Sequence, residues 1–178
     1  KFLMKKTVLF LPFIVFLLFA CSSAPKQPEG VYIRKNRAAD YSDFGNQYFN
    51  LGEYSQALTF FQLALDENIA ADYEQGIARS ANSIGRVYIT LKETAAAENY
   101  ISDAYELSKK LDNSGLIAIS AINMAEISLQ KNDNTSAENY INEAIANAKS
   151  GSDLIAQIYH IQGIFAQKKG DNAGALAS

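Results

Sequence analysis

Pairs of small residues recur at a constant separation along this chain of 178 residues, and this feature constrains the fold more than any other. The first member of each pair is glycine or alanine, the second is always alanine, and the two stand 12 positions apart. Small residues on facing helices let two helix backbones approach closely. Each unit is therefore expected to be a hairpin of two antiparallel helices. The pairs are Gly45 and Ala57, Gly85 and Ala97, Ala125 and Ala137, and Gly163 and Ala175.

The units repeat with a period of 38 to 40 residues, because their first small residues stand at positions 45, 85, 125 and 163. The pentapeptide AENYI occurs unchanged at 97–101 and at 137–141. The order of glycine, tyrosine, alanine and phenylalanine in FGNQYFNLGEYSQALTFFQLAL, residues 44–65, resembles the tetratricopeptide repeat, whose usual unit has about 34 residues. The resemblance implies an all-α fold, a right-handed α-solenoid of antiparallel helix pairs with about 3.5 repeats over residues 38–178. Helical pairs of the HEAT type are the nearest alternative.

The additional residues of each unit are expected between one hairpin and the next, because the spacing inside every hairpin is fixed. We place them at the end of each second helix and the start of the following first helix. These junctions lie around 66–73, 109–116 and 150–154.

A turn between the two helices of each unit is indicated by the residues after the first helix. Glycine or asparagine stands there in three units, and Lys92 in the second. Glycine and asparagine accept the left-handed conformation that ends a helix, so strain or an altered turn is expected at Lys92. We interpret the acid that follows each break as a cap of the next helix rather than as a metal ligand. These acids are Glu53, Glu93, Asp133 and Asp171.

Residues 1–20 have the layout of a secretory signal peptide, with lysines before an uncharged, apolar run at 7–20. The run ends in LFAC, which resembles the lipobox of bacterial lipoproteins, and Cys21 is the only cysteine of the chain. The resemblance implies a lipoprotein cleaved before Cys21, with acyl chains such as palmitate anchoring it to a membrane. The alternative is an uncleaved anchor with an inert thiol.

Removal of this leader would take three of the 16 basic residues and leave 13 against 19 acidic ones, a net charge of -6. The negative net charge of the remaining chain argues against nucleic-acid binding. Residues 21–37 are rich in Ser, Pro, Lys, Gln and Gly, which predicts a flexible tether from Cys21. The resemblance to bacterial lipoproteins implies a cell-envelope location, with the lipid anchor in the outer membrane and the body facing the periplasm.

No nucleophile motif, phosphate-binding loop or His/Cys ligand cluster occurs in the sequence, so neither an enzyme nor a cofactor or metal is expected. The resemblance implies binding on the concave surface formed by the first helices. Ser42 and Ile119 replace lysines of the chaperone-binding subset, so that subset's carboxylate clamp is not expected. Arg79 and Arg86 are candidates to bind an acidic group, with a solvated face paired to nearby acids as the alternative. The mapped groove residues are Asn46, Phe49, Arg79, Asn82, Arg86, Asn123, Glu126 and His160.

These features predict a protein-protein interaction scaffold for other envelope proteins or peptides, in assembly, secretion or pilus-type machinery. An alternative is an accessory protein of a transporter that binds a solute or peptide. An envelope hydrolase would require a further domain. The fourth unit stops soon after its second helix begins, so we expect the natural chain to continue past Ser178.

Overall fold

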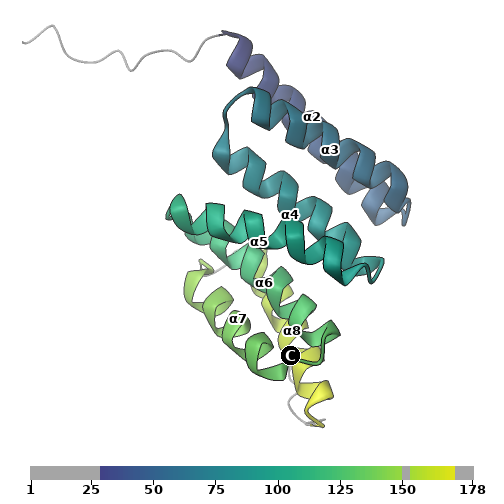
Figure 1. Ribbon diagram of the computed structural model, residues 1–178, viewed down its shortest axis with the longest axis vertical. Helices are drawn as coiled ribbons and strands as arrows, with labels where there is room; N and C mark the ends of the chain where they lie inside the picture. Colours follow the sequence, from purple (N-terminus) through teal and green to yellow (C-terminus); the bar gives the residue numbers. More distant parts are fainter. Residues whose placement is uncertain (1–28, 150–152, 171–178) are drawn as a thin grey trace, which may run out of the picture.

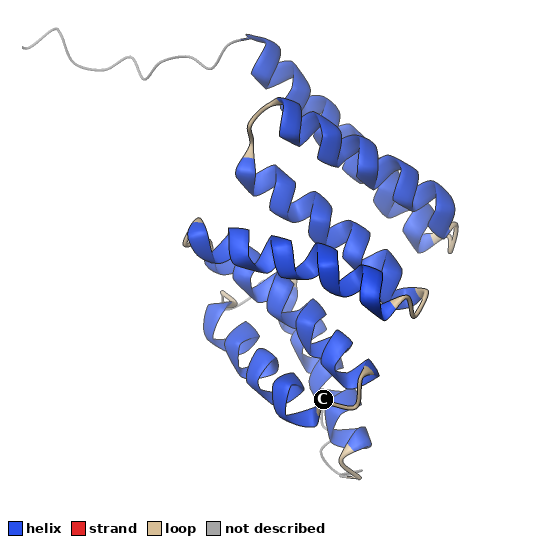
Figure 2. Ribbon diagram, in the orientation of Figure 1, coloured by secondary structure: helices blue, strands red, loops and turns tan. Residues whose placement is uncertain are grey.

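The computed structural model describes residues 29–149 and 153–170, and the regular structure of these residues is entirely α-helical (Figure 1 and Figure 2). No helix among them is both long and apolar enough to span a membrane. The helices are α2 (Glu29–Asn50), α3 (Tyr54–Ala70), α4 (Glu74–Thr90), α5 (Thr94–Lys110), α6 (Ser114–Gln130), α7 (Asn134–Asn147) and α8 (Leu154–Lys168).

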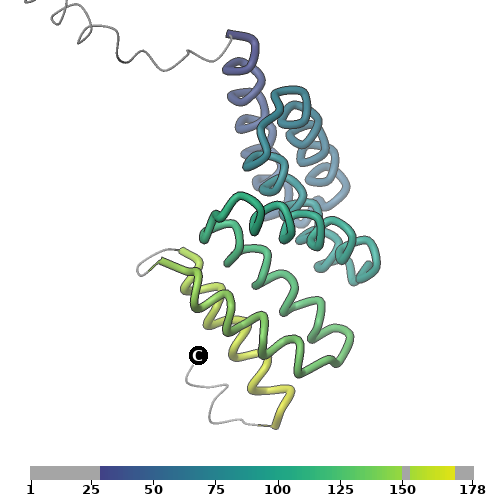
Figure 3. The backbone as a smooth tube through the Cα atoms, turned by 60° about the vertical axis from the view of Figure 1, so that its left-hand side comes forward, coloured from purple at the N-terminus to yellow at the C-terminus, as the bar shows by residue number. Residues whose placement is uncertain are grey.

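The helices form hairpins that stack in chain order. Helix α2 packs against α3, α4 against α5, and α6 against α7, while α8 packs on α6 and α7 as the first helix of a fourth unit. The first helices of successive units also touch, since α4 contacts both α2 and α6, and α6 contacts α8. Figure 3 shows the units following one another from the α2 end to the α8 end. The described part of the chain is an all-α helical-repeat solenoid, as predicted.

The lengths of the helices account for the long repeat. Helices α3, α4, α5 and α6 have 17 residues each. Helices α3, α5 and α7 begin at positions 54, 94 and 134, and α4, α6 and α8 begin at 74, 114 and 154. At the junctions 66–73 and 109–116 the helices continue almost to the turn, so the additional residues are helical there, as predicted. The junction at 150–154 lies partly outside the described residues.

The small residues lie where the two helices of a hairpin come together. The alanine of every described pair is fully buried. A Cβ atom added to Gly45 would lie 2.5 Å from Cε1 of Phe61, and one added to Gly85 would lie 2.3 Å from Cδ1 of Ile101. These distances are far shorter than the roughly 3.5 to 4.0 Å of a normal carbon contact. The predicted close approach of the helices is confirmed.

Lys92 forms the same turn that glycine forms in the first unit. Its φ angle is 61°, against 77° for Gly52. The backbone N–H of Glu93 donates to the carbonyl of Tyr88 at 2.9 Å, which closes the turn in the way that is common at helix C-termini. The prediction of an altered turn is therefore wrong. The strain is in the left-handed backbone itself, which a Cβ atom makes less favourable.

The acids that begin the second helices cap them only in part. The side chain of Asp133 accepts a hydrogen bond from the backbone N–H of Ser136 at 3.0 Å. Glu53 and Glu93 make no side-chain hydrogen bond of this kind, so the capping prediction is wrong for them. The shorter Asp side chain suits an N-cap, and glutamate is not among the preferred cap residues. Asp171 lies outside the described residues.

Helix α2 begins at Glu29, so the predicted tether of residues 21–37 is wrong from residue 29 onward. Arg34 Nη1 and Arg37 Nε lie 3.1 and 3.5 Å from the carboxylate oxygens of Glu67 on α3. Composition predicted a tether, but Arg34 and Arg37 stand on a helix and form ion pairs with the next one.

The other N-terminal predictions fall outside the described residues. These are the signal peptide at 1–20, the lipidated Cys21 and the remainder of the tether.

Candidate binding groove

Two adjoining hollows lie along the first helices of the units, and we call them together the groove. One has a volume of about 260 Å³ and is lined from α2, α4, α6 and α8; the other has about 280 Å³ and is lined from α4, α6 and α8. The Arg79 hollow is lined by Ser42, Asn46, Arg79, Asn82, Ser83, Arg86, Ile119, Asn123, Leu154 and Gln157. The His160 hollow is lined by Arg86, Ile122, Asn123, Glu126, Ala156, Gln157, His160 and Ile161.

The structure brings the predicted groove residues together. Each of them lines one or both hollows except Phe49, which lies beneath the guanidinium of Arg86. Ser83 also lines the Arg79 hollow and was not predicted, although it stands 40 positions before Asn123 and so shares its place in the repeat. That these residues bind a partner remains a prediction.

Arg86 lies between the two hollows and is held by α2. Its Nη2 donates to Oδ1 of Asn46 at 3.0 Å, and its guanidinium carbon lies 4.4 Å from the ring centroid of Phe49. Its Nε is buried and has no hydrogen-bond partner among the described residues. Burial lowers the pKa of Arg86, but an arginine keeps its charge in proteins. Arg86 therefore presents an oriented, partly desolvated positive charge to the groove.

Asn82 and Asn123 line the groove and are also hydrogen-bonded to each other, so part of their bonding capacity joins the helices. Both are buried, at 3% and 6% exposure. Asn82 Nδ2 donates to the Ser120 hydroxyl oxygen at 2.8 Å and to the Ala78 carbonyl at 3.1 Å, and its Oδ1 accepts from Asn123 Nδ2 at 2.9 Å. Buried polar groups are nearly always paired in this way. The network links α4 to α6 under the floor of the groove.

Glu126 gives the His160 hollow a different character. Burial raises the pKa of Glu126, and the electrostatic interaction with nearby His160 lowers it to a smaller extent. The carboxylate makes no hydrogen bond within the described residues, which also contain no group of three or more potential metal ligands. This hollow therefore combines a poorly solvated acid with the aliphatic side chains of Ile122 and Ile161.

Arg79 is exposed at the other end of the Arg79 hollow. The ion pairs found in the described part of the chain involve neither Arg79 nor Arg86. The alternative in which nearby acids neutralise the two arginines is therefore not seen there. Their charges are left to face the groove.

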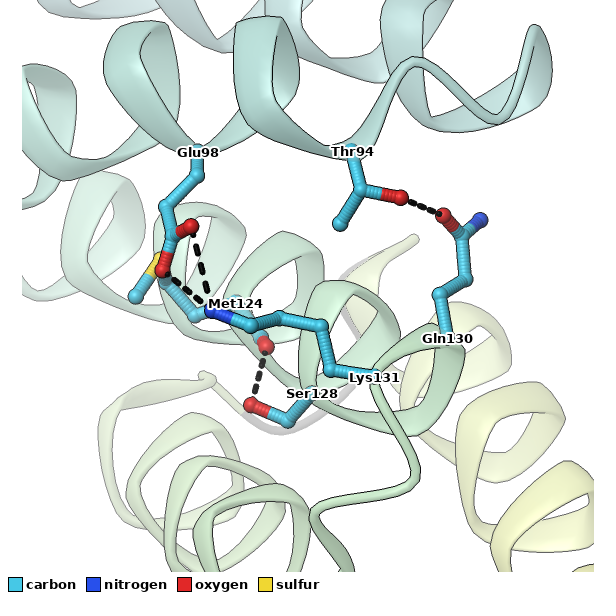
Figure 4. A network of polar contacts seen from close by, with 6 residues as sticks. All are labelled: Thr94, Glu98, Met124, Ser128, Gln130 and Lys131. Atoms are coloured by element: carbon cyan, nitrogen blue, oxygen red, sulfur yellow. Dashed lines mark hydrogen bonds and ion pairs between the residues drawn. The ribbon is translucent and has the colours of Figure 1, made fainter.

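Several polar contacts between consecutive units were not predicted from the sequence. Lys131 pairs with Glu98 at 2.9 Å, and the Thr94 hydroxyl donates to Gln130 Oε1 at 3.1 Å (Figure 4). Gln130 Nε2 also donates to the Ile89 carbonyl at 2.9 Å and so satisfies the end of α4. These bonds join the end of α6 to α4 and α5 of the preceding hairpin.

Stacked helical hairpins with a groove along their first helices define a helical-repeat solenoid. A family model described as tetratricopeptide repeat matches residues 76–150. Residues 76–150 therefore carry tetratricopeptide repeats, and repeats of this kind imply protein partners.

Two solved structures support the fold. BtubC (BKLC) from P. vanneervenii is 23% identical with a TM-score of 0.64, and the match covers 94% of this chain and 68% of that one. The protein pilF of Pseudomonas aeruginosa is 17% identical with a TM-score of 0.54, and the match covers 80% of this chain and 58% of that one. No curated protein matches the chain. At these identities the likeness concerns the fold alone.

Proposed function

We propose that this chain is an envelope-anchored scaffold that binds other envelope proteins or peptides in its groove, within assembly, secretion or pilus-type machinery. The observation that carries the proposal is the groove itself, in which hydrogen-bonding side chains such as Arg79 and Gln157 lie beside aliphatic ones such as Ile119. A peptide segment needs both kinds of contact, because its backbone is polar and its side chains are often apolar.

The size of the hollows favours a peptide over an enclosed solute. Each is smaller than the roughly 300 to 1,000 Å³ of typical small-ligand pockets. Since Arg86, Asn123 and Gln157 line both hollows, an extended segment can place one side chain in each. An accessory protein of a transporter that encloses a bound solute is the less favoured alternative.

The envelope setting is supported by the N-terminal sequence. The apolar run at 7–20 ends directly before Cys21, the expected site of lipid attachment. One structural neighbour carries the name pilF, which motivates pilus-type machinery as one of the settings.

Photocrosslinking in intact cells tests the scaffold function. A benzophenone amino acid would replace Gln157, an exposed residue that lines both hollows. The matched control would carry it at Asp103, an exposed residue of α5 that lines neither hollow. We expect a protein adduct from position 157 and none from position 103. Equal capture at both positions, or none at 157, would contradict binding in the groove.

A further inference from the structure

Arg79 and Arg86 bring two uncompensated positive charges into one hollow. They stand seven positions apart on α4, which is close to two helical turns, so their side chains leave the same face. No aspartate or glutamate lines the Arg79 hollow, and the ion pairs of the described residues use other basic side chains. The electrostatic character of this hollow is therefore positive.

Arg86 is oriented before any partner arrives. The hydrogen bond to Asn46 and the stacking on Phe49 fix its guanidinium plane. An arginine has five N–H donors, and the described residues accept from one of them. A partner group that binds here does not have to order this side chain, which reduces the entropy lost on binding.

The neighbouring His160 hollow differs, because Arg86 shares its lining with the carboxylate of Glu126. A second negative charge there would lie beside the carboxylate of Glu126, whose pKa is already raised by burial. Ile122, Ile161 and Ala156 supply an aliphatic lining instead. The two hollows therefore distinguish an acidic side chain from an apolar one along the same groove.

We propose that the Arg79 hollow binds a carboxylate carried by the partner, an aspartate or glutamate side chain of an extended segment whose nearby apolar residue enters the His160 hollow. Arg79 and Arg86 are the residues that determine this specificity. A carboxylate matches the planar, forked donors of arginine. This inference rests on the proposed scaffold function and names the chemistry of the segment bound.

A random dodecapeptide library, selected on the full chain, tests the proposal. We expect the enriched peptides to share an acidic residue and an aliphatic residue at a fixed spacing. The dissociation constant of one enriched peptide, measured by fluorescence polarisation, should rise about 10- to 100-fold for Arg79→Gln or Arg86→Gln, because hydrogen bonds to charged groups are stronger than neutral ones. Replacing the acid of the peptide by its amide should weaken binding to the native chain and have little effect on the doubly substituted chain.

Arg37→Gln is the matched control, since Arg37 pairs with Glu67 and lines neither hollow. Arg79 is exposed, so its variant keeps the test valid even if Arg86→Gln unfolds the protein. Enriched peptides that lack a shared acid, or that bind both variants normally, would overturn the inference and leave the scaffold function standing. If free glutarate competed as well as the peptide, the inference that the carboxylate is carried by a protein partner would be overturned. Failure to enrich any peptide, together with no crosslinking at position 157, would overturn both proposals.

Discussion

Replacing Gly45 by alanine should destabilise the first hairpin, whereas the same change at Gly85 should be nearly neutral. A Cβ atom at Gly45 would lie 2.5 Å from Cε1 and 2.6 Å from Cδ1 of Phe61, a fully buried ring that cannot bend. At Gly85 the Cβ would meet Cδ1 and Cγ1 of Ile101 at 2.3 and 2.5 Å, atoms of an aliphatic side chain that can change its χ angles. The ring must shift as a unit to relieve the first contact, so the two sites should respond differently.

The third unit shows that this fold accepts an alanine at the position that Gly85 occupies in the second unit. Ala125 occupies the place of Gly85 there, 40 positions later, and packs with Ile141 in a buried cluster. An alanine therefore fits opposite isoleucine in this fold. Opposite Phe61 the added methyl overfills the core, which costs about 1 to 3 kcal/mol. Replacing glycine by alanine within a helix stabilises it by about 1 kcal/mol, which offsets part of the cost of overfilling the core.

The net expectation for Gly45→Ala is a loss of up to about 2 kcal/mol in the free energy of unfolding, and for Gly85→Ala a change within about 0.5 kcal/mol. Urea unfolding followed by far-ultraviolet circular dichroism measures both. Combining Gly45→Ala with Phe61→Ile recreates the pair found in the third unit, so the two changes should couple by about 1 kcal/mol or more. Equal effects at the two glycines, or strict additivity in the double variant, would refute the packing explanation.

Cys21→Ala should move the protein from the membrane to the soluble fraction on cell fractionation, and continued membrane retention would exclude lipidation as the anchor. Asn82→Ala should lower the free energy of unfolding by about 1 to 3 kcal/mol, because it leaves the buried amide of Asn123 without its acceptor; an unchanged urea midpoint would show that water replaces the bond. Burial raises the folded pKa of Glu126 above its ordinary value of 4.5. Ionisation of Glu126 therefore costs the folded chain more than the unfolded chain, and the protein becomes less stable as pH rises through the folded pKa. Glu126→Gln should therefore be more stable than the native chain at about pH 7 and similar to it at about pH 4, as measured by urea unfolding at both pH values; the same difference at both would contradict a titrating Glu126.

Much of the fold could be predicted because its determinants lie close together in the chain. The interval from Gly45 to Ala57 is set by one hairpin, and the structure shows the expected close contact at Phe61. The positions that line the groove could be mapped from the repeat, since equivalent residues of stacked helices face the same way. The start of α2 could not be predicted, because its contacts with α3, among them the ion pairs with Glu67, join residues 30 or more positions apart.

The sequence by itself determined the helical hairpins, their register and the composition of the surface that the first helices present. Only the tertiary structure decided which of those side chains are available to a partner. Asn82 and Asn123 take part in a buried hydrogen-bond network whose members lie 38 and 41 positions apart in sequence. Arg86 is instead oriented by α2 and keeps most of its donors. The spacing of residues along a helix fixes the direction in which a side chain leaves the backbone. The hydrogen bonds it makes depend on neighbours that only the stacking of units brings within reach.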